Sequence, residues 1–165
     1  MLKVVEGDIT KLQVDAIVNA ANTSLMGGGG VDGAIHGAAG RELVLECMLL
    51  NGCKVGEAKA TPGFKLPAKY VIHAVGPFWR GGQNNEPELL ASSYRHAVLV
   101  AELLRVKTLA FPCISCGIFG YPIDLAAPVA IQTIKDHIEK GSYIEEITFC
   151  CYTAQDANIY RNLLV

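Results

Sequence analysis

Short runs rich in β-branched residues alternate along the chain with longer segments in which apolar residues recur every three or four positions. Runs of the first kind predict strands, and segments of the second kind predict helices that bury one face. With helices between most of the strands, the simplest architecture packs helices on both faces of one sheet. The sequence therefore predicts an α/β fold, a three-layer α/β/α sandwich with a central mixed sheet.

The expected strands cover residues 2–5, 16–19, 58–63, 70–75, 108–112 and 147–152, and the expected helices cover residues 33–50, 87–104, 123–140 and 155–164. Two of these helices carry a clear apolar stripe. The stripe positions are Leu90, Tyr94, Ala97, Ala101 and Leu104 in one helix, and Ala127, Ile131, Ile134 and Ile138 in the next. Pro122 is expected to start the second of them, and Gly141 to end it.

The chain has 165 residues, and this length suits one domain with one substantial core. The most obvious loop, residues 80–85, has similar composition on both sides, so we predict a single domain over residues 1–165. No stretch approaches the ~20 apolar residues of a membrane span. The first residues lack the pattern of a signal peptide, so we expect a cytoplasmic protein without membrane contact.

Charge and cysteine usage narrow the range of partners. The chain has 16 acidic and 14 basic side chains, which gives no reason to expect direct nucleic-acid binding. Cys150 and Cys151 are neighbours that a strand would point to opposite faces, which argues against a disulfide framework. Cys113 and Cys116 form a pair at metal-ligand spacing without a second such pair. We therefore predict no metal and no cofactor, with metal binding by this pair as the minor alternative.

Two glycine-rich segments lie between a predicted strand and a predicted helix. They are residues 26–33, which contain four consecutive glycines, and residues 115–122. Glycines permit positive φ and close backbone approach, so their amides can line an anion at a helix N-terminus. Ligands of α/β sheets bind outside the carboxyl ends of the strands, where one phosphorylated ligand would contact both segments. Neither has the spacing of a Walker A or dinucleotide motif, and a flexible connection is the alternative for each.

Several segments, in this order along the chain, resemble motifs of the macrodomain family: Gly7-Asp8-Ile9-Thr10, Asn19-Ala20-Ala21-Asn22, residues 28–36 and residues 115–122. Residues 75–82 are similar to the bacterial O-acetyl-ADP-ribose deacetylase branch of that family. The resemblance covers almost the whole chain. It implies a hydrolase that binds ADP-ribose and converts O-acetyl-ADP-ribose to ADP-ribose and acetate. It also implies ADP-ribosylated proteins as substrates, through removal of ADP-ribose from acidic side chains.

The resemblance implies how the adenine end of ADP-ribose is held. The carboxylate of Asp8 would accept a hydrogen bond from the exocyclic amine, and the backbone amide of Ile9 would face the ring. Tyr152 would stack on adenine. Two structural alternatives stay open, because Asp8 also suits a helix cap before Thr10 and Tyr152 also suits core packing.

The resemblance assigns the diphosphate to a nest of backbone amides, which needs no lysine or arginine. Its residues are Ser115, Cys116, Gly117, Ile118 and Phe119. Phe119 would also pack on the distal ribose, and Gly30 and Val31 would close the opposite side. A turn cap is the alternative role of Ser115.

Asp32 and Asn22 are the predicted catalytic residues. Water is a poor nucleophile until a base removes its proton, and Asp32 is suited to that role. Asn22 cannot act as a base, but its amide can orient the ribose and the water. The alternatives are that Asp32 caps the helix near Gly33 and that a diphosphate oxygen activates the water. His36 is expected to be a structural hydrogen-bonding residue.

Gly37 and Cys116 depart from the family pattern, in which arginine and threonine are common, and this bears on substrate choice. Two further functions stay open. One is a non-catalytic reader of ADP-ribose, for which a base at Asp32 has no use. The other is a regulator that binds a protein or RNA, since the resemblance implies a link to ribonuclease III control. No basic or aromatic stripe supports direct contact with RNA.

Overall fold

The computed structural model describes residues 1–165 and contains one six-stranded sheet in the order β1-β6-β5-β2-β4-β3. The strands are β1 Leu2–Glu6, β2 Ala16–Ala21, β3 Ala58–Pro62, β4 Tyr70–Val75, β5 Thr108–Phe111 and β6 Glu146–Cys151. Only β3 runs antiparallel to its neighbour, and all other pairs are parallel. The predicted mixed sheet is confirmed.

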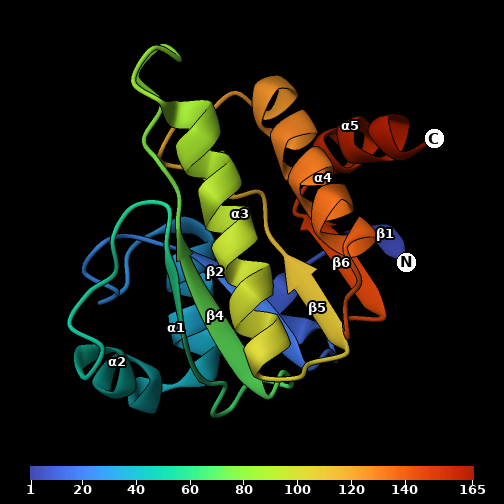
Figure 1. Ribbon diagram of the computed structural model, residues 1–165. Coiled ribbons are helices and arrows are strands. Elements are labelled where there is room, and N and C mark those ends of the chain that lie inside the picture. Colours follow the sequence, from blue (N-terminus) through green and yellow to red (C-terminus); the bar gives the residue numbers. More distant parts are fainter.

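Helices cover both faces of the sheet (Figure 1). The helices are α1 Gly30–Ala39, α2 Arg41–Met48, α3 Glu86–Leu103, α4 Ile123–Glu139 and α5 Ala154–Leu164, with a short 3-10 helix η1 at Ile9–Lys11. One core joins α1 and α2 to the sheet, and the other joins α3, α4 and α5 to its opposite face. This arrangement confirms the α/β/α sandwich.

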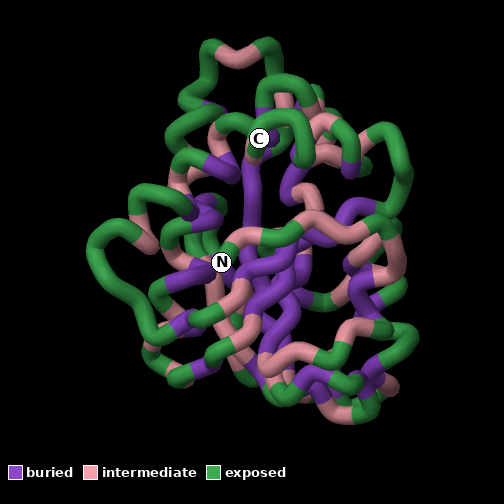
Figure 2. Tube along the Cα trace, turned by 90° about the vertical axis from the view of Figure 1, so that its right-hand side faces the viewer, coloured by how far each residue is buried: buried purple, intermediate pink, exposed green.

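Alternate residues of each strand enter the two cores, as the period of a strand requires. Figure 2 shows the buried residues gathered along the central strands. Ile17 and Val71 pack toward α1 and α2, whereas Val18 and Ile72 pack toward α3 and α4. Cys150 and Cys151 enter opposite cores, which confirms the prediction for that pair.

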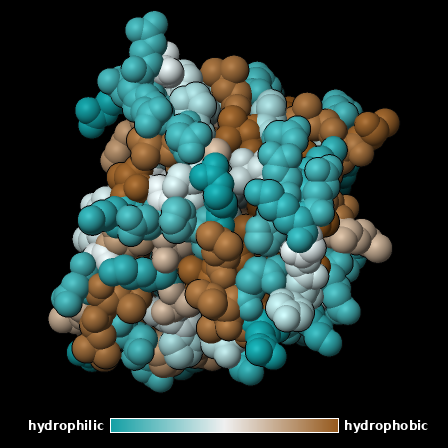
Figure 3. All heavy atoms as spheres, in the orientation of Figure 1, coloured by the Kyte–Doolittle hydropathy of each residue, from teal (hydrophilic) through white to brown (hydrophobic).

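The outer surface over α3 and α4 is mainly hydrophilic (Figure 3). Apolar side chains interrupt it at Leu99, Leu103 and Leu125, each of which is exposed. None of the helices combines the length and the apolar character that crossing a membrane requires.

The helix predicted over residues 33–50 is wrong, because two helices occupy this segment. α1 begins earlier, at Gly30, and ends before Gly40, which separates it from α2. Gly40 has a φ of 92°, in the left-handed region that stops a helix. The apolar period continues across Gly40, so hydrophobic spacing alone could not reveal this break. Most other predicted boundaries lie within two residues of the observed ones.

β2 and β5 separate toward their carboxyl ends. Their parallel pairing consists of Ala16 with Leu109 and Ile17 with Ala110. On its other side, β2 stays paired with β4 as far as Ala21. The chain leaves β2 toward α1 on one face of the sheet and leaves β5 toward α4 on the other, which makes this edge a topological switch point.

The loop of residues 80–85 is fixed by one buried carboxylate at the start of α3. Glu86 accepts hydrogen bonds from the backbone N–H groups of Arg80 at 2.8 Å, Gly82 at 2.9 Å and Asn84 at 2.6 Å. Burial acts to raise the pKa of Glu86, but these N–H groups outweigh it and lower the pKa to about 2. Charged Glu86 therefore stabilises the folded state.

We expect Glu86→Gln to lower the melting temperature at pH 7, because an amide cannot replace a carboxylate that accepts three N–H groups. The folded pKa of Glu86 is about 2 and its ordinary value is 4.5. Its stabilising effect should thus be complete above pH 4.5 and disappear as the pH falls toward 2. Thermal melts from pH 7 to pH 2 should show the two proteins converging over this range.

The matched control is Glu88→Gln, since the side chain of Glu88 lies in the same helical turn and is 65% exposed. It should change the melting temperature little at any pH. A constant difference between the parental protein and Glu86→Gln from pH 7 to pH 2 would contradict this account of the loop.

Candidate active site

A cavity of about 750 Å³ opens where β2 and β5 separate. Every site residue predicted from the sequence lines it: Asp8, Ile9, Asn22, Gly30, Val31, Asp32, Ser115, Cys116, Gly117, Ile118, Phe119 and Tyr152. The two glycine-rich segments therefore face one space, as expected from their positions after β2 and β5. The structure leaves the role of each residue toward a ligand as a prediction.

Asp32 lies in the first turn of α1 and is 5% exposed. The helix begins after Gly29, so the alternative that Asp32 caps it is wrong. Its Oδ1 atom accepts a hydrogen bond from Asn19 Nδ2 at 2.9 Å, on the buried side. The other oxygen, Oδ2, lies near Gly28 of the cavity wall, since a Cβ atom added to Gly28 would lie 3.3 Å from it, and it accepts no hydrogen bond within the protein.

Asn22 lies near the same glycine. The same Cβ atom on Gly28 would be 3.4 Å from Asn22 Nδ2. The loop fixes the amide, since Nδ2 donates to Gly27 O at 3.0 Å and Oδ1 accepts from Ser24 Oγ at 2.7 Å and Leu25 N at 3.1 Å. One amide hydrogen of Asn22 is left for a ligand or a water molecule.

The first glycine-rich segment needs glycine at two positions for clear reasons. Gly30 has a φ of 58°, and a Cβ atom on Gly33 would lie 2.5 Å from the carbonyl oxygen of Gly28. The N-cap of α1 is Gly29, which offers no side chain to the first amides of the helix. An uncapped helix N-terminus at a cavity suits an anion.

The second segment also presents unused amides. The backbone N–H groups of Gly117, Ile118 and Phe119 make no hydrogen bond within the protein, whereas Cys116 N donates to Cys113 O at 3.2 Å. Ser115 has a φ of 68°, and its buried Oγ atom has no partner, so the turn-cap alternative is wrong.

No lysine or arginine lines the cavity. Its charged side chains are the carboxylates of Asp8, Asp32 and Asp156. An anionic ligand must therefore be held by neutral donors, chiefly backbone N–H groups, and it must keep its negative groups away from these carboxylates.

Asp8 and Tyr152 lie at the far end of the cavity from Asp32 in the predicted ligand pose. Asp8 Oδ1 accepts from Thr10 Oγ1 at 2.7 Å and from Thr10 N at 2.9 Å, which lowers the pKa of Asp8. The capping alternative is therefore observed, and it leaves Asp8 Oδ2 without a partner. Tyr152 is 82% exposed, so the core-packing alternative is wrong.

The sequence reasoning missed several residues of the cavity wall. Phe78 stacks on Phe119 with ring centroids 3.9 Å apart, and Asp156 lines the cavity from the first turn of α5. Gly76 gives room to the second segment, since a Cβ atom there would lie 2.2 Å from Ser115 Oγ. The similarity of residues 75–82 to a family segment was the signal for Phe78 and Gly76, and no comparable pattern marked Asp156.

The cysteines near the cavity are free thiols. Burial raises the pKa of Cys116 to about 12, with further contributions from Cys113 and Asp156. No group of three or more His, Cys, Asp or Glu side chains lies close enough to hold a metal ion. Cys116 and Cys113 therefore form an inert part of the cavity wall at neutral pH.

His36 makes none of the hydrogen bonds expected of it. Its Nε2 atom lies 3.4 Å from Asp32 Oδ1 without hydrogen-bond geometry and has no other partner. Gly37 lies outside the cavity lining, and a Cβ atom there would meet nothing within 4 Å. The departure at Gly37 therefore changes the outer surface of α1, whereas the one at Cys116 lies in the cavity wall.

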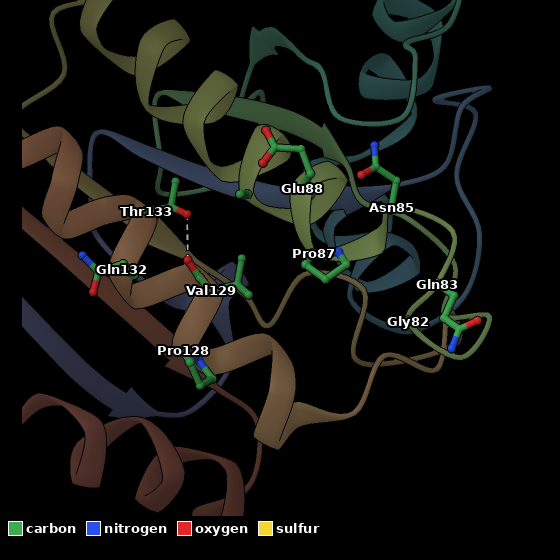
Figure 4. A pocket seen from close by; sticks show the side chains of 10 residues that line it. Gly82, Gln83, Asn85, Pro87, Glu88, Pro128, Val129, Gln132 and Thr133 are labelled. Atoms are coloured by element: carbon green, nitrogen blue, oxygen red, sulfur yellow. Dashed lines mark hydrogen bonds between the residues drawn. The ribbon is translucent and has the colours of Figure 1, made fainter.

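A second hollow, of about 810 Å³, lies between α3 and α4 (Figure 4). None of the predicted site residues lines it, and Glu88 is its only ionisable side chain. It offers neither a pair of interacting acid and base groups nor a glycine-rich loop. The cavity beside β2 and β5 is therefore the candidate active site.

Comparisons with known proteins show the family of this chain. Residues 18–130 match the family described as Macro domain. The chain is 53% identical to Macro domain-containing protein RSc0334 of Ralstonia nicotianae, over 99% of this chain and 94% of that protein. It is 52% identical to the O-acetyl-ADP-ribose deacetylase of Salmonella typhimurium, over 99% of this chain and 93% of that protein.

A solved structure is similar in fold as well. The Trypanosoma brucei macrodomain in complex with ADP-ribose superposes with a TM-score of 0.93 at 38% identity, over 99% of this chain and 69% of that chain. The family match spans most of the sheet and both glycine-rich segments described above. The chain belongs to the macro domain family.

Proposed function

We propose that the cavity binds ADP-ribose and that the protein hydrolyses O-acetyl-ADP-ribose to ADP-ribose and acetate. One observation carries the proposal: Asp32 Oδ2 and Asn22 Nδ2 both lie near Gly28, in the wall of a cavity that has free backbone amides and no lysine or arginine. The relatives named for O-acetyl-ADP-ribose deacetylation and the ADP-ribose complex of a related macrodomain support it.

In the proposed pose, adenine lies between Asp8, Ile9 and Tyr152. The diphosphate accepts hydrogen bonds from the free N–H groups of residues 117–119 and from the N-terminus of α1. The distal ribose then lies against Gly30 and Val31, beneath Phe119. This pose brings an acyl group on the distal ribose close to Asp32 and Asn22.

The proposed reaction is ester hydrolysis with Asp32 as general base. Asp32 takes a proton from water while the water oxygen bonds to the acetyl carbonyl carbon. The bond from that carbon to the ribose oxygen then breaks, and the proton passes from Asp32 to the ribose oxygen. Asn22 holds the ribose and orients the water. Acetate and ADP-ribose are the products.

The same chemistry applies to ADP-ribose esterified to an acidic side chain of a protein, which we propose as a second substrate class. The open mouth of the cavity supports this extension, since Phe78, Ile118 and Tyr152 at its rim are all exposed. The six free cysteines also favour a reducing compartment, and we propose a cytoplasmic location.

A non-catalytic reader is the competing function. A reader requires the amides and the adenine contacts, but it gains nothing from a nearly buried carboxylate at the ribose end. Burying a charged carboxylate costs free energy, and Asp32 Oδ2 accepts no hydrogen bond within the protein. This cost favours catalysis over simple recognition.

Gly117→Val should weaken ADP-ribose binding at least about tenfold, equivalent to ~1.4 kcal/mol, because it adds a side chain where the diphosphate is proposed to lie. A Cβ atom at Gly117 meets nothing in the protein, and its φ is not positive, so the fold should tolerate the change. Gly30 is less suitable, because its positive φ would strain any valine. Isothermal titration calorimetry measures the effect.

Gly37→Val is the matched control, because that position is also open and lies outside the cavity. It should bind ADP-ribose like the parental protein. Equal affinity in a folded Gly117→Val variant would remove this loop from the binding surface.

Asp32→Asn should lower kcat for O-acetyl-ADP-ribose by about 10²-fold or more while changing the Kd for ADP-ribose by less than about tenfold. An asparagine keeps an oxygen that accepts from Asn19, so the local structure should survive. Product chromatography gives the rate, and calorimetry gives the affinity. Asp136→Asn, an exposed change on α4, controls for the substitution itself.

Retention of the parental rate by folded Asp32→Asn would identify another base, with a diphosphate oxygen as the first candidate. A parental protein that binds ADP-ribose but cleaves neither the acetyl ester nor an ADP-ribosylated carboxylate would be a reader.

A further inference from the structure

A chain of buried polar side chains runs beneath Asp32, away from the cavity. Asn19 on β2 and His73 on β4 face each other across the parallel pairing, and Thr61 lies on β3. Their exposed fractions are 0%, 0% and 3%. None of the three lines the cavity.

The Asn19 amide, which must present a donor to the Asp32 carboxylate, sets the direction of the hydrogen bonds in this chain. Asn19 Nδ2 donates to Asp32 Oδ1 at 2.9 Å and lies 3.1 Å from His73 Nδ1. An amide nitrogen only donates, so His73 Nδ1 must be an acceptor without a proton. Neutral His73 then carries its proton on Nε2, which lies 3.0 Å from Thr61 Oγ1.

The far end of the chain is anchored to the backbone. Thr61 Oγ1 accepts from His73 Nε2 and donates its own hydrogen to Pro62 O at 3.1 Å. Cys47 Sγ lies 3.7 Å from the same nitrogen, but a thiol is a weak acceptor. Because the Thr61 hydroxyl gives its hydrogen to Pro62 O, it faces Nε2 as an acceptor and favours the Nε2–H form of the imidazole.

The surroundings keep His73 neutral. Burial lowers the pKa of His73 to about 3, and the nearby ring of His36, 6.3 Å away, adds to the effect. At neutral pH the ring is therefore in one of two neutral tautomers, and the amide of Asn19 and the hydroxyl of Thr61 both favour the one protonated on Nε2.

The orientation of the Asn19 side-chain amide depends on the tautomer of His73. Its Oδ1 atom is buried and has no hydrogen-bond partner. The observed orientation of the amide is therefore held only by the two acceptors in front of Nδ2, Asp32 Oδ1 and His73 Nδ1. If His73 carried its proton on Nδ1, that N–H would face the Asn19 NH₂ group. Rotation of the amide would then turn its oxygen toward the Asp32 carboxylate.

We infer that His73 and Thr61 are positioning residues for Asp32, which they orient through Asn19. They hold Oδ1 on the buried side, toward Asn19, and leave Oδ2 near Gly28 without a hydrogen bond to the protein. The inference rests on the proposed role of Asp32 as the base. Removing the hydroxyl of Thr61 should therefore change catalysis from a position that never touches the ligand.

The test compares Thr61→Val with Thr61→Ser. Valine has nearly the shape of threonine but cannot accept from His73 Nε2, whereas serine keeps the hydroxyl. We expect Thr61→Val to lower kcat for O-acetyl-ADP-ribose by about ten- to a hundredfold, because a misplaced base is costly. The Kd for ADP-ribose should change less than about twofold, and Thr61→Ser should restore most of kcat. Thermal melts establish that both variants are folded.

A second measurement does not depend on activity. The ¹⁵N chemical shifts of the His73 ring in the parental protein should report a protonated Nε2 and an unprotonated Nδ1, and Thr61→Val should shift the population toward Nδ1–H. A parental ring protonated on Nδ1 would overturn the inference. So would folded Thr61→Val with parental kcat, or an equal loss of kcat in Thr61→Ser.

If the proposed hydrolase function is wrong, the experiments give a different result from the one expected if only the positioning inference is wrong. In that case the parental protein hydrolyses no O-acetyl-ADP-ribose, and neither Thr61 variant has a rate to compare. The ¹⁵N shifts of the His73 ring are then the remaining test of the inference. A protonated Nε2 in the parental protein that is lost in Thr61→Val supports the proposed hydrogen-bond chain, and any other pattern overturns it.

Discussion

The separation of β2 from β5 after only two paired positions determines where the ligand-binding cavity lies. After two paired residues on each strand, β2 continues beside β4 and leaves β5. The loops that follow diverge to α1 on one face and to α4 on the other, and the cavity opens between them. The sheet thereby forms the floor of the cavity, and both glycine-rich segments become its walls.

That geometry explains how the cavity could bind an anionic ligand without basic side chains. The cavity contains three carboxylates and no lysine or arginine, so phosphates must be held there by neutral donors, chiefly oriented backbone N–H groups. Such groups are useful only where the loop backbone is fixed. Asn22 fixes the first loop through three hydrogen bonds. In the second, Trp79 N donates to Phe119 O at 2.8 Å, which ties the loop to the segment that Glu86 anchors.

Periodicity in the sequence was enough to predict the six strands and the layers, and the two glycine-rich segments predicted a site at the carboxyl ends of the strands. Positions with a positive φ were harder to predict. The apolar period runs through Gly40, where the helical segment breaks between α1 and α2. The start of α1 was also missed, and with it the true place of Asp32 inside the first turn. Contacts between distant residues left no local pattern, as with Asn19 and His73, which are 54 positions apart.

The central claim is that backbone amides of residues 117–119 hold the diphosphate of ADP-ribose while its distal ribose lies beside Asp32. A crystal structure of the parental protein with ADP-ribose tests it most directly. The account predicts diphosphate oxygens within hydrogen-bond distance, about 2.7–3.2 Å, of the N–H groups of Gly117, Ile118 and Phe119. A diphosphate held by side chains instead, or a ligand in the groove between α3 and α4, would contradict it.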